Sequence, residues 1–462
     1  MTSGTPSSPT LVRALSLRSV VLFGLAYMTP LIVLGIFGVT ASATGGASTS
    51  AYVLALIAMI FTALSYGKMA AAFPVAGSAY SYVRRTIDSR VGFLVGWAVL
   101  LDYLFLPMVI WLIGGSYLQA QFPAVPFWVW IVAFIAITTL LNVVGVQVAD
   151  KANFLLMAFQ LLVVVIFVAL SIAHVVGLGG ARALADPAPF WNDTSSIAGI
   201  AGGAAIAAYS FLGFDAVTTL TEETIEPRKT IPRAILLVAL IGGVVFIIVS
   251  YAAQLVRPGG MFDSPDAESS AAFYLARTIG DTLFSSIFLG GLVIAQFASG
   301  LAAQAGASRL MYAMGRDSVL PHRVFGYLHP RFRTPVLCIA LTALVGLIAL
   351  TIDVATSTSF INFGAFTAFT MVNVSVVAHY VRRRTEGVAL NPITYVLLPV
   401  VGALVDLYLL TKLDSTAIEL GLGWLAVGVI YLAVLTKGFR KAPPEVQFSE
   451  DVELEGPARA GR

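Results

Sequence analysis

Runs of about 20 apolar residues recur along nearly the whole chain, and they constrain its fold more than any other feature. A helix of about 20 residues crosses the roughly 30 Å hydrocarbon core of a bilayer. With 58% hydrophobic residues and a mean hydropathy of +0.90, the chain lies far outside the range of soluble domains. We therefore predict an all-α integral membrane protein with twelve spans, at residues 19–41, 48–72, 91–118, 126–147, 152–175, 197–222, 231–256, 283–313, 335–352, 358–381, 391–411 and 418–437.

The first run also allows a second interpretation, a cleaved signal peptide with the small residues ASA at 41–43 as its cleavage site. Its apolar stretch is longer than the roughly 7 to 15 residues typical of such signals, and many similar runs follow it. A first membrane span is therefore favoured.

Basic residues indicate the orientation, because Lys and Arg near span ends are retained on the cytoplasmic side. With the N-terminus inside, all but four of the 27 Lys and Arg residues fall in the cytoplasm. The four exceptions are Arg182, Arg257, Arg277 and Lys412. This distribution predicts a multi-pass protein of the cytoplasmic (plasma) membrane with an even number of spans and both termini in the cytoplasm.

Several classes of function are disfavoured by composition. A net charge of +3 with no basic arm argues against nucleic-acid binding. The single cysteine, Cys338, has no partner for a disulfide, and the four histidines lack the spacing of metal ligands. We expect no metal, no organic cofactor and no enzymatic activity, with the lipid bilayer and a small molecule as partners and no obligatory protein partner.

The first and sixth spans each carry helix breakers near their middle, in VVLFGLAYMTPLIVLGIFGVTASATGG and IAGIAGGAAIAAYSFLGFDAVTTLTEE. Pro30 lacks the amide that would bond to the carbonyl of Ala26, and we expect the break near 30–35. In the sixth span it is expected near 210–213. Non-helical backbone at mid-membrane needs protein or a water-filled cavity around it, so paired breaks five spans apart indicate an inverted-repeat transporter. Alternatively, the glycines serve close helix packing.

Two facing breaks would form one small polar cavity. The half-helices that start at the midplane present amides there, and those that end there present free carbonyls. Such a cavity accommodates a carboxylate and an ammonium group together.

Three stretches resemble the amino acid, polyamine and organocation (APC) permease superfamily: KMAAAFPVAGSAYSYVRR at 68–85, SFLGFDAVTTLTEETIEPRKTIPRAI at 210–235 and ASRLMYAMGRDSVLPHRVFGYLHPRFRTP at 307–335. Through GLAYMTP, LLDYLFLP, SFLGFDAVTTL and INFGAF the chain most resembles the putrescine importers of that superfamily. The resemblance covers about residues 15–440.

The resemblance implies a LeuT-like fold of two inverted five-helix repeats, with broken helices 1 and 6, plus two further helices. The chain would then divide into disordered tails at 1–14 and 441–462, a transport core at 15–385 and a last helix pair at 386–440. The implied substrate-binding residues are Tyr27, Thr29, Gly35, Tyr103, Tyr209, Ser210, Phe211, Gly213, Asp215 and Gln296.

Three groups have more specific expected roles. Tyr209 matches an aromatic gate in relatives, or is an ordinary packed aromatic. Asp215 matches an acid linked to gating or coupling, or caps the inner half-helix. Asp102 is an intramembrane acid, whose insertion costs about 2.5 to 3.5 kcal/mol unless it faces an interior; it is a cation or coupling site, or a hydrogen-bond acceptor between helices. Glu222 and Glu223 at the cytoplasmic mouth are expected in a solvated charge cluster or inner gate.

The chain also departs from family patterns. It reads LGIFG at 34–38 where many amino acid permeases have a Gly-Ser-Gly type turn that grips a carboxylate. Putrescine importers carry an aspartate at the position of Gly35. Some proton-driven relatives have a lysine in the fifth helix, where this chain offers only Gln160. The coupling ion, H⁺ or Na⁺, therefore stays open.

These observations predict a secondary-active transporter that imports a small amine or amino acid by ion-coupled alternating access. On the sequence alone, amino acids are expected to compete for uptake at least as well as putrescine. The alternatives are a dedicated putrescine or polyamine importer and, from another class, a channel or a non-transporting membrane sensor.

Overall fold

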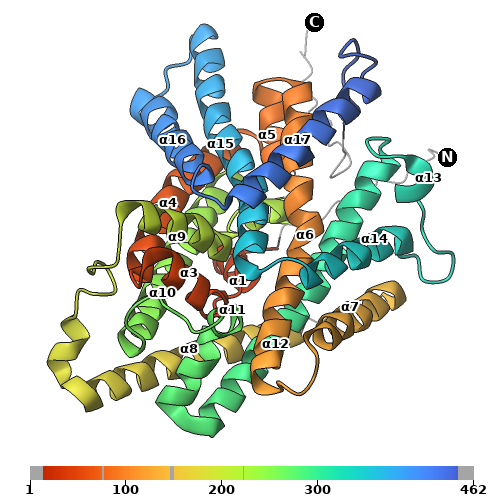
Figure 1. Cartoon of the computed structure of the whole chain (residues 1–462). Coiled ribbons are helices and arrows are strands. Elements are labelled where there is room, and N and C mark those ends of the chain that lie inside the picture. The colour runs from red at the N-terminus through yellow and green to blue at the C-terminus, as the bar shows by residue number, and fades with distance from the viewer. Residues whose placement is uncertain (1–13, 75–77, 146–149, 222, 446–462) are drawn as a thin grey trace, which may run out of the picture.

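The computed structural model describes residues 14–74, 78–145, 150–221 and 223–445, which form a bundle of helices (Figure 1). Within this part of the chain the only strand-like pairing is a single parallel bridge between Leu15 and Thr224. Eleven helical segments are long and apolar enough to cross a membrane, and the predicted ninth span is a shorter apolar helix, Val336–Leu350. The all-α membrane fold is therefore confirmed. The tails predicted at 1–14 and 441–462 lie almost wholly outside the described residues.

In chain order the helices are α1 (Leu17–Tyr27), α2 (Ile32–Gly35), α3 (Phe37–Thr44), α4 (Ser48–Ala72), α5 (Ser78–Thr86), α6 (Ser89–Gln121), α7 (Phe127–Val144), α8 (Asp150–Gly179), η1 (Ala181–Ala185), α9 (Ile197–Ala207), η2 (Ala208–Phe211), η3 (Ala216–Leu220), α10 (Pro227–Val256), α11 (Pro265–Ser269), α12 (Ala271–Arg316), α13 (His322–Phe325), α14 (Val336–Gly346), η4 (Leu347–Leu350), α15 (Val354–Thr385), η5 (Ile393–Leu397), α16 (Leu398–Leu410) and α17 (Ser415–Leu435). Helix α12 bends at Gly280 and Asp281, where the backbone leaves helical geometry, so its spanning part begins close to the predicted residue 283.

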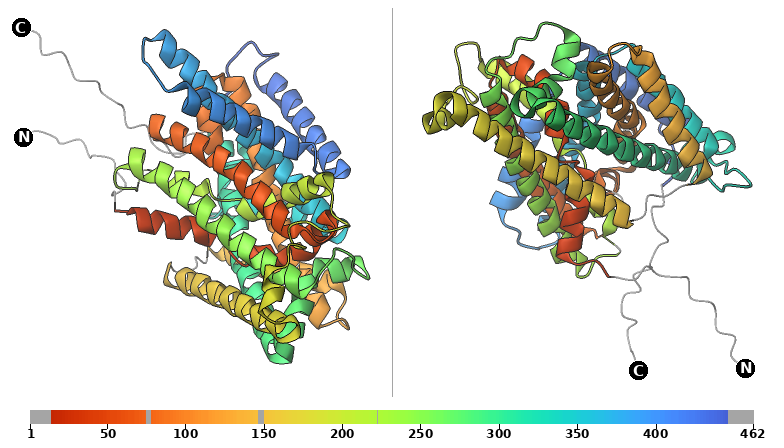
Figure 2. Two further views of the ribbon diagram at one scale, coloured as in Figure 1. Left: turned by 90° about the vertical axis from the view of Figure 1, so that its left-hand side faces the viewer. Right: turned by 90° about the horizontal axis from the view of Figure 1, so that it is seen from below.

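Helices that lie five spans apart in the sequence pack against each other. The most extensive contacts between helices join α4 to α10 and α6 to α12, and α3 of the first span packs on α9 of the sixth. Figure 2 shows α4 and α10 side by side. This pairing fits two inverted five-helix repeats, the LeuT-like arrangement expected from the resemblance.

The first span is broken between α1 and α2, slightly before the predicted position. Helix α1 ends at Tyr27, Thr29 has a left-handed φ of 51°, and residues 32–35 are helical again. The cause is Pro30, which donates no hydrogen bond and disfavours helical geometry in the residue before it. The expected break at 30–35 therefore moves to 28–31, and a second irregularity follows at Ile36, with φ −118° and ψ 13°.

The sixth span breaks where predicted, but its inner half is not an α-helix. After η2, Leu212 is extended and Gly213 has a φ of 100°. The segment then continues as turns and the short 3-10 helix η3. Its backbone bonds span three residues, from the Thr218 amide to the Asp215 carbonyl and from the Thr221 amide to the Thr218 carbonyl, and the hydroxyls of Thr219 and Thr221 donate to carbonyls three residues back. The expected inner half-helix is thus wrong.

The two breaks face each other, as predicted. The ring of Tyr27 lies so close to Gly213 that a Cβ atom there would overlap it. One turn earlier, a Cβ on Gly24 would come within 2.8 Å of Val217. The absence of side chains at these two glycines therefore lets the first and sixth spans approach at their irregular segments.

The two described ends of the chain, Ala14 and Glu445, lie on the same side of the bundle, here called the terminal face (Figure 2). The amide of Ala14 donates to the Glu223 carbonyl over 2.9 Å, and Arg84 pairs with Glu445 at 3.2 Å. The opposite face carries the short helix α11. An even number of spans follows from this placement.

Candidate substrate-binding site

A cavity of about 260 Å³ extends from the facing breaks toward the terminal face. Four of the sequence-predicted residues line it: Tyr27, Thr29, Tyr209 and Gln296. Most of its remaining wall is apolar, and comes from Phe23, Ala26, Met28, Ile32, Leu106, Ile110, Leu156, Leu212, Ala295, Ala298, Ala302 and Ala303, together with the polar Gln160 and Ser299. The cavity therefore suits a ligand with an aliphatic body and few polar groups.

The cavity is accessible from the terminal face and closed toward the opposite face. On the accessible side, Phe23 is 37% exposed and Tyr27 is 40% exposed. On the closed side, Phe37 and Ala41 of α3 are buried, and Gly38 lies directly against the backbone of Glu268 in α11. A side chain at Gly38 would collide with that carbonyl group. The contacts of α3 with α11 therefore close the cavity on that side.

The two predicted acids, Asp102 and Asp215, lie behind the cavity wall. Tyr27 belongs to the wall and is within electrostatic reach of both carboxylates, and its hydroxyl approaches that of Tyr103. Tyr209 is within reach of Asp102. The structure therefore brings together two acids from different spans and three tyrosines around one cavity.

The partners of the two acids bear on their alternative roles. Asp215 accepts a hydrogen bond from Ser78 Oγ of α5 over 3.1 Å and makes no capping bond to η3, so the alternative of a helix cap is wrong. Asp102 Oδ1 is buried and has no hydrogen-bond partner among the described residues. An unpaired carboxylate oxygen near a cavity favours a cation-binding role over that of an acceptor between helices.

Tyr103 does not line the cavity, and neither do four other predicted residues. Ser210 Oγ lies 3.2 Å from the hydroxyl of Tyr52, and Phe211 packs edge-on against Phe246 with ring centres 5.2 Å apart. Gly213 lies under the Tyr27 ring, and Gly35 is buried in α2 near Gln296. These residues shape the site from behind, and their contact with substrate stays a prediction.

Gln160 is the polar group whose contact with the cavity sequence reasoning missed. Its side chain is 8% exposed, lines the cavity from α8, and has an Oε1 atom without a hydrogen-bond partner in the described part of the chain. The sequence feature that could have indicated this contact is a polar amide side chain inside the apolar fifth span. Ser299 is the other missed polar residue; it is one of several serines in α12, so its presence gives no comparable signal.

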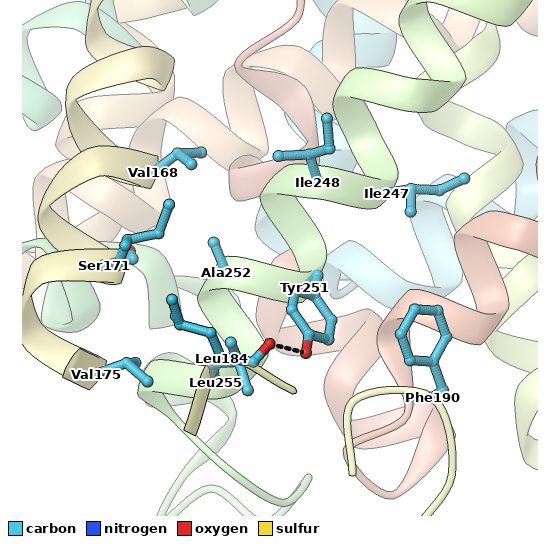
Figure 3. Close-up of a pocket in the computed structure, with 11 residues that line it drawn as sticks. Val168, Ser171, Val175, Leu184, Phe190, Ile247, Ile248, Tyr251, Ala252 and Leu255 are labelled. Atoms are coloured by element: carbon cyan, nitrogen blue, oxygen red, sulfur yellow. Dashed lines mark hydrogen bonds between the residues drawn. The ribbon is translucent and has the colours of Figure 1, made fainter. Parts of the chain in front are cut away.

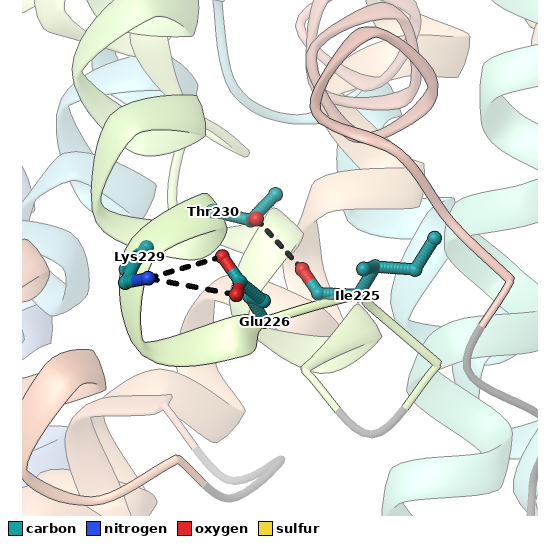
Figure 4. A network of polar contacts seen from close by, with 4 residues as sticks. All are labelled: Ile225, Glu226, Lys229 and Thr230. Atoms are coloured by element: carbon teal, nitrogen blue, oxygen red, sulfur yellow. Dashed lines mark hydrogen bonds and ion pairs between the residues drawn. The ribbon is translucent and has the colours of Figure 1, made fainter.

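Backbone contacts hold the described part of the predicted inner-gate segment against the N-terminal segment of the chain. The amides of Ala14 and Leu15 both donate to the carbonyl of Glu223, each over 2.9 Å. Glu222, the other predicted inner-gate residue, lies outside the described residues. In the nearby charge cluster, Lys229 pairs with Glu226 at 3.3 Å, and Thr230 Oγ1 donates to the Ile225 carbonyl (Figure 4).

A larger hollow of about 330 Å³ lies elsewhere, between α8 and α10 (Figure 3). Its walls are almost entirely aliphatic and aromatic, and the hydroxyl of Tyr251 donates to the Leu184 carbonyl over 2.7 Å. It contains no charged side chain and none of the predicted site residues. Size alone therefore does not identify the substrate site.

Replacing Tyr209 by alanine is expected to weaken substrate binding by roughly 1 to 3 kcal/mol, through lost stacking and cation–π attraction to an ammonium group. Tyr209 is only 5% exposed and lines the cavity, so the ring is held in place. The comparison is made by measuring binding and uptake of Tyr209→Ala and Tyr209→Phe at equal expression. Normal uptake by the alanine variant would assign the ring to packing alone.

Comparison with known proteins identifies the family. The amino acid permease family model matches residues 19–411, so the chain belongs to the amino acid permease family. It is 40% identical to the low-affinity putrescine importer PlaP of Escherichia coli, over 94% of this chain and 96% of the importer. It is also 26% identical to the branched-chain amino acid permease BcaP of Bacillus subtilis, over 93% and 94% of the two chains. These relatives are transporters of small molecules, and the chain is a multi-pass membrane protein of that kind.

Proposed function

We propose that this chain is a secondary carrier that imports a small aliphatic diamine of the putrescine type across the cytoplasmic membrane, by alternating access coupled to an ion gradient. The observation that carries the proposal is the pair of carboxylates, Asp102 and Asp215, around a mostly apolar cavity. A diamine has two ammonium groups joined by a short aliphatic chain. It needs two separated anionic or carbonyl partners and an apolar wall between them.

The likeness to a putrescine importer supports this assignment. On the sequence alone, amino acids are expected to compete for uptake at least as well as putrescine, because Gly35 offers no carboxylate for a second ammonium group. In the structure, α2 is too short to present a strong amide site, whereas two acids lie near the cavity. The proposal therefore shifts the expected preference to the diamine.

The terminal face is assigned to the cytoplasm, because a topology with both termini there leaves all but four of the 27 Lys and Arg residues on the cytoplasmic side. On this assignment the described state opens inward, and α3 with α11 closes the outer side. Import then consists of an outward-open state that loads the cavity and an inward-open state that releases the substrate.

Uptake competition tests the proposed substrate. Cells that lack their own putrescine uptake express the chain and take up labelled putrescine in the presence of unlabelled diamines, monoamines or amino acids. Diamines are expected to compete best, since only they fill both carboxylate sites. Stronger competition by amino acids would reassign the carrier to amino acid transport, which the likeness to BcaP makes the second candidate.

A further inference from the structure

A third acid is buried in the membrane-spanning region, away from the cavity. Asp406 of α16 is fully buried where α16 meets α4 and α15. Thr62 Oγ1 donates to its Oδ2 atom over 2.8 Å, and Asn373 Nδ2 donates to the same atom over 3.0 Å. Ser65 Oγ in turn donates to Asn373 Oδ1 over 2.5 Å. Polar side chains from two helices, α4 and α15, thus converge on the carboxyl group of a third, α16.

The other carboxyl oxygen, Oδ1, is buried and has no hydrogen-bond partner among the described residues. Helix α16 packs against α4, α9, α15 and η5, and α9 contains no ionisable side chain. The ionisable groups of the other packed elements and of α16 itself contact other groups. On α4 and η5, the ammonium of Lys68 lies over the Tyr395 ring, Tyr66 lies near Asp215, and the Tyr52 hydroxyl lies 3.2 Å from Ser210 Oγ. On α15 and α16, His379 packs against the Phe73 ring, Arg384 donates to the Tyr380 hydroxyl, and Tyr408 lies under the ammonium of Lys412. Beyond these, Arg382 and Arg383 at the end of α15 pair with Glu386.

A buried carboxylate without a counter-ion is costly, and two neutral donors do not balance its charge. Binding one proton removes the charge at once. A metal cation would instead need several oxygen ligands, whereas here Thr62 and Asn373 direct hydrogen atoms at Oδ2. The arrangement therefore favours a proton at Oδ1.

Two connections lead from this group to the broken sixth span. Along α15, Asn362 lies eleven residues before Asn373, three turns away on the same helix face, and its Nδ2 donates to the Ala205 carbonyl at the end of α9 over 2.7 Å. Along α4, Tyr66 follows Ser65 and packs edge-on against Phe214, with ring centres 5.7 Å apart. Side chains on α4 and α15 thus connect the surroundings of Asp406 to both flanks of the break.

We infer that Asp406 is a proton-binding site of the transport cycle, separate from the substrate cavity and linked to the sixth-span break through α4 and α15. The inference rests on the proposed function, since it supplies the coupling ion of that carrier. One proton adds to Oδ1 of the ionised carboxylate in one state of the cycle and leaves to water in another. In the described state the group is sealed from solvent.

The test uses purified full-length protein in proteoliposomes with labelled putrescine. Two quantities are measured: counterflow without an ion gradient, and accumulation driven by an imposed pH gradient or an imposed Na⁺ gradient. For Asp406→Asn we expect counterflow to persist while accumulation driven by the pH gradient falls at least tenfold. The control is Ser375→Ala, because Ser375 is buried on the neighbouring helix α15 and bonds back to the Met371 carbonyl.

A second variant, Thr62→Val, keeps Asp406 in place. It tests the inference even if Asp406→Asn fails to fold. Thr62→Val removes one donor to Oδ2 without changing the side-chain shape, and lost stabilisation of the charged form moves the pH midpoint of accumulation upward. Unchanged proton-driven accumulation in Asp406→Asn, or an unchanged midpoint in Thr62→Val, would overturn the inference. Accumulation driven by Na⁺ and not by H⁺ would overturn it as well. A wild-type protein without counterflow would instead refute the proposed function.

Discussion

Asp102→Asn and Asp215→Asn are each expected to reduce substrate binding by roughly 10- to 100-fold, with a matching loss of uptake at low substrate concentration. A hydrogen bond to a charged partner contributes about 1.5 to 3 kcal/mol, and each 1.4 kcal/mol is about a tenfold change in affinity. Both acids lie within electrostatic reach of Tyr27 in the cavity wall. Binding is measured by thermal shift of the purified variants against putrescine.

The control for this prediction is Asp263→Asn, because Asp263 is an exposed acid in the loop before α11. A diamine requires both acids, so a loss in only one variant would favour a substrate with a single ammonium group. Wild-type uptake by both asparagine variants would remove the charge-based account of the site.

Gly213→Val is expected to abolish uptake and to lower thermal stability. Gly213 has a φ of 100°, which side-chain-bearing residues adopt only at a cost of about 1 to 3 kcal/mol, and its Cα lies under the Tyr27 ring. A new side chain must displace Tyr27, which lines the cavity. The measurements are the apparent melting temperature and uptake per molecule at the cell surface.

Gly423→Ala is the matched control for Gly213→Val, since a Cβ on Gly423 in α17 would meet no atom within 4 Å. This variant is expected to transport normally. Normal transport by Gly213→Val as well would show that the approach of the two broken spans at this point is not needed for function.

Apolar run length was sufficient to predict the fold, because the bilayer sets the length of each span. The breaks were predictable because their causes are local. Pro30 lacks a backbone amide hydrogen, and Gly213 can adopt a positive φ. The exact residues of the first break depend on how Thr29 responds to the proline that follows it. The loss of α-helix after Gly213 was not predicted, because apolar patterning does not distinguish turns and a 3-10 helix from an α-helix.

The candidate site was harder to predict, because side-chain direction is set by packing between distant helices. Tyr27 and Tyr209 line the cavity as predicted, but Ser210 contacts Tyr52 instead. Asp406 shows the same limit: Asp102 and Asp215 were predicted as deep acids, and this third one was not. Its partners, Thr62 and Asn373, are more than 300 residues apart in the sequence, so no local pattern marks the group.

Counterflow in proteoliposomes tests the central claim, that this chain is an alternating-access carrier of a small amine. Vesicles containing purified protein are loaded with unlabelled putrescine and diluted into labelled putrescine without any ion gradient. A carrier exchanges the two, so transient accumulation of label above equilibrium is expected, and Asp102→Asn and Asp215→Asn vesicles should lack it. A channel would only equilibrate the label and a sensor would admit none; either result, with correctly folded protein, would contradict the account.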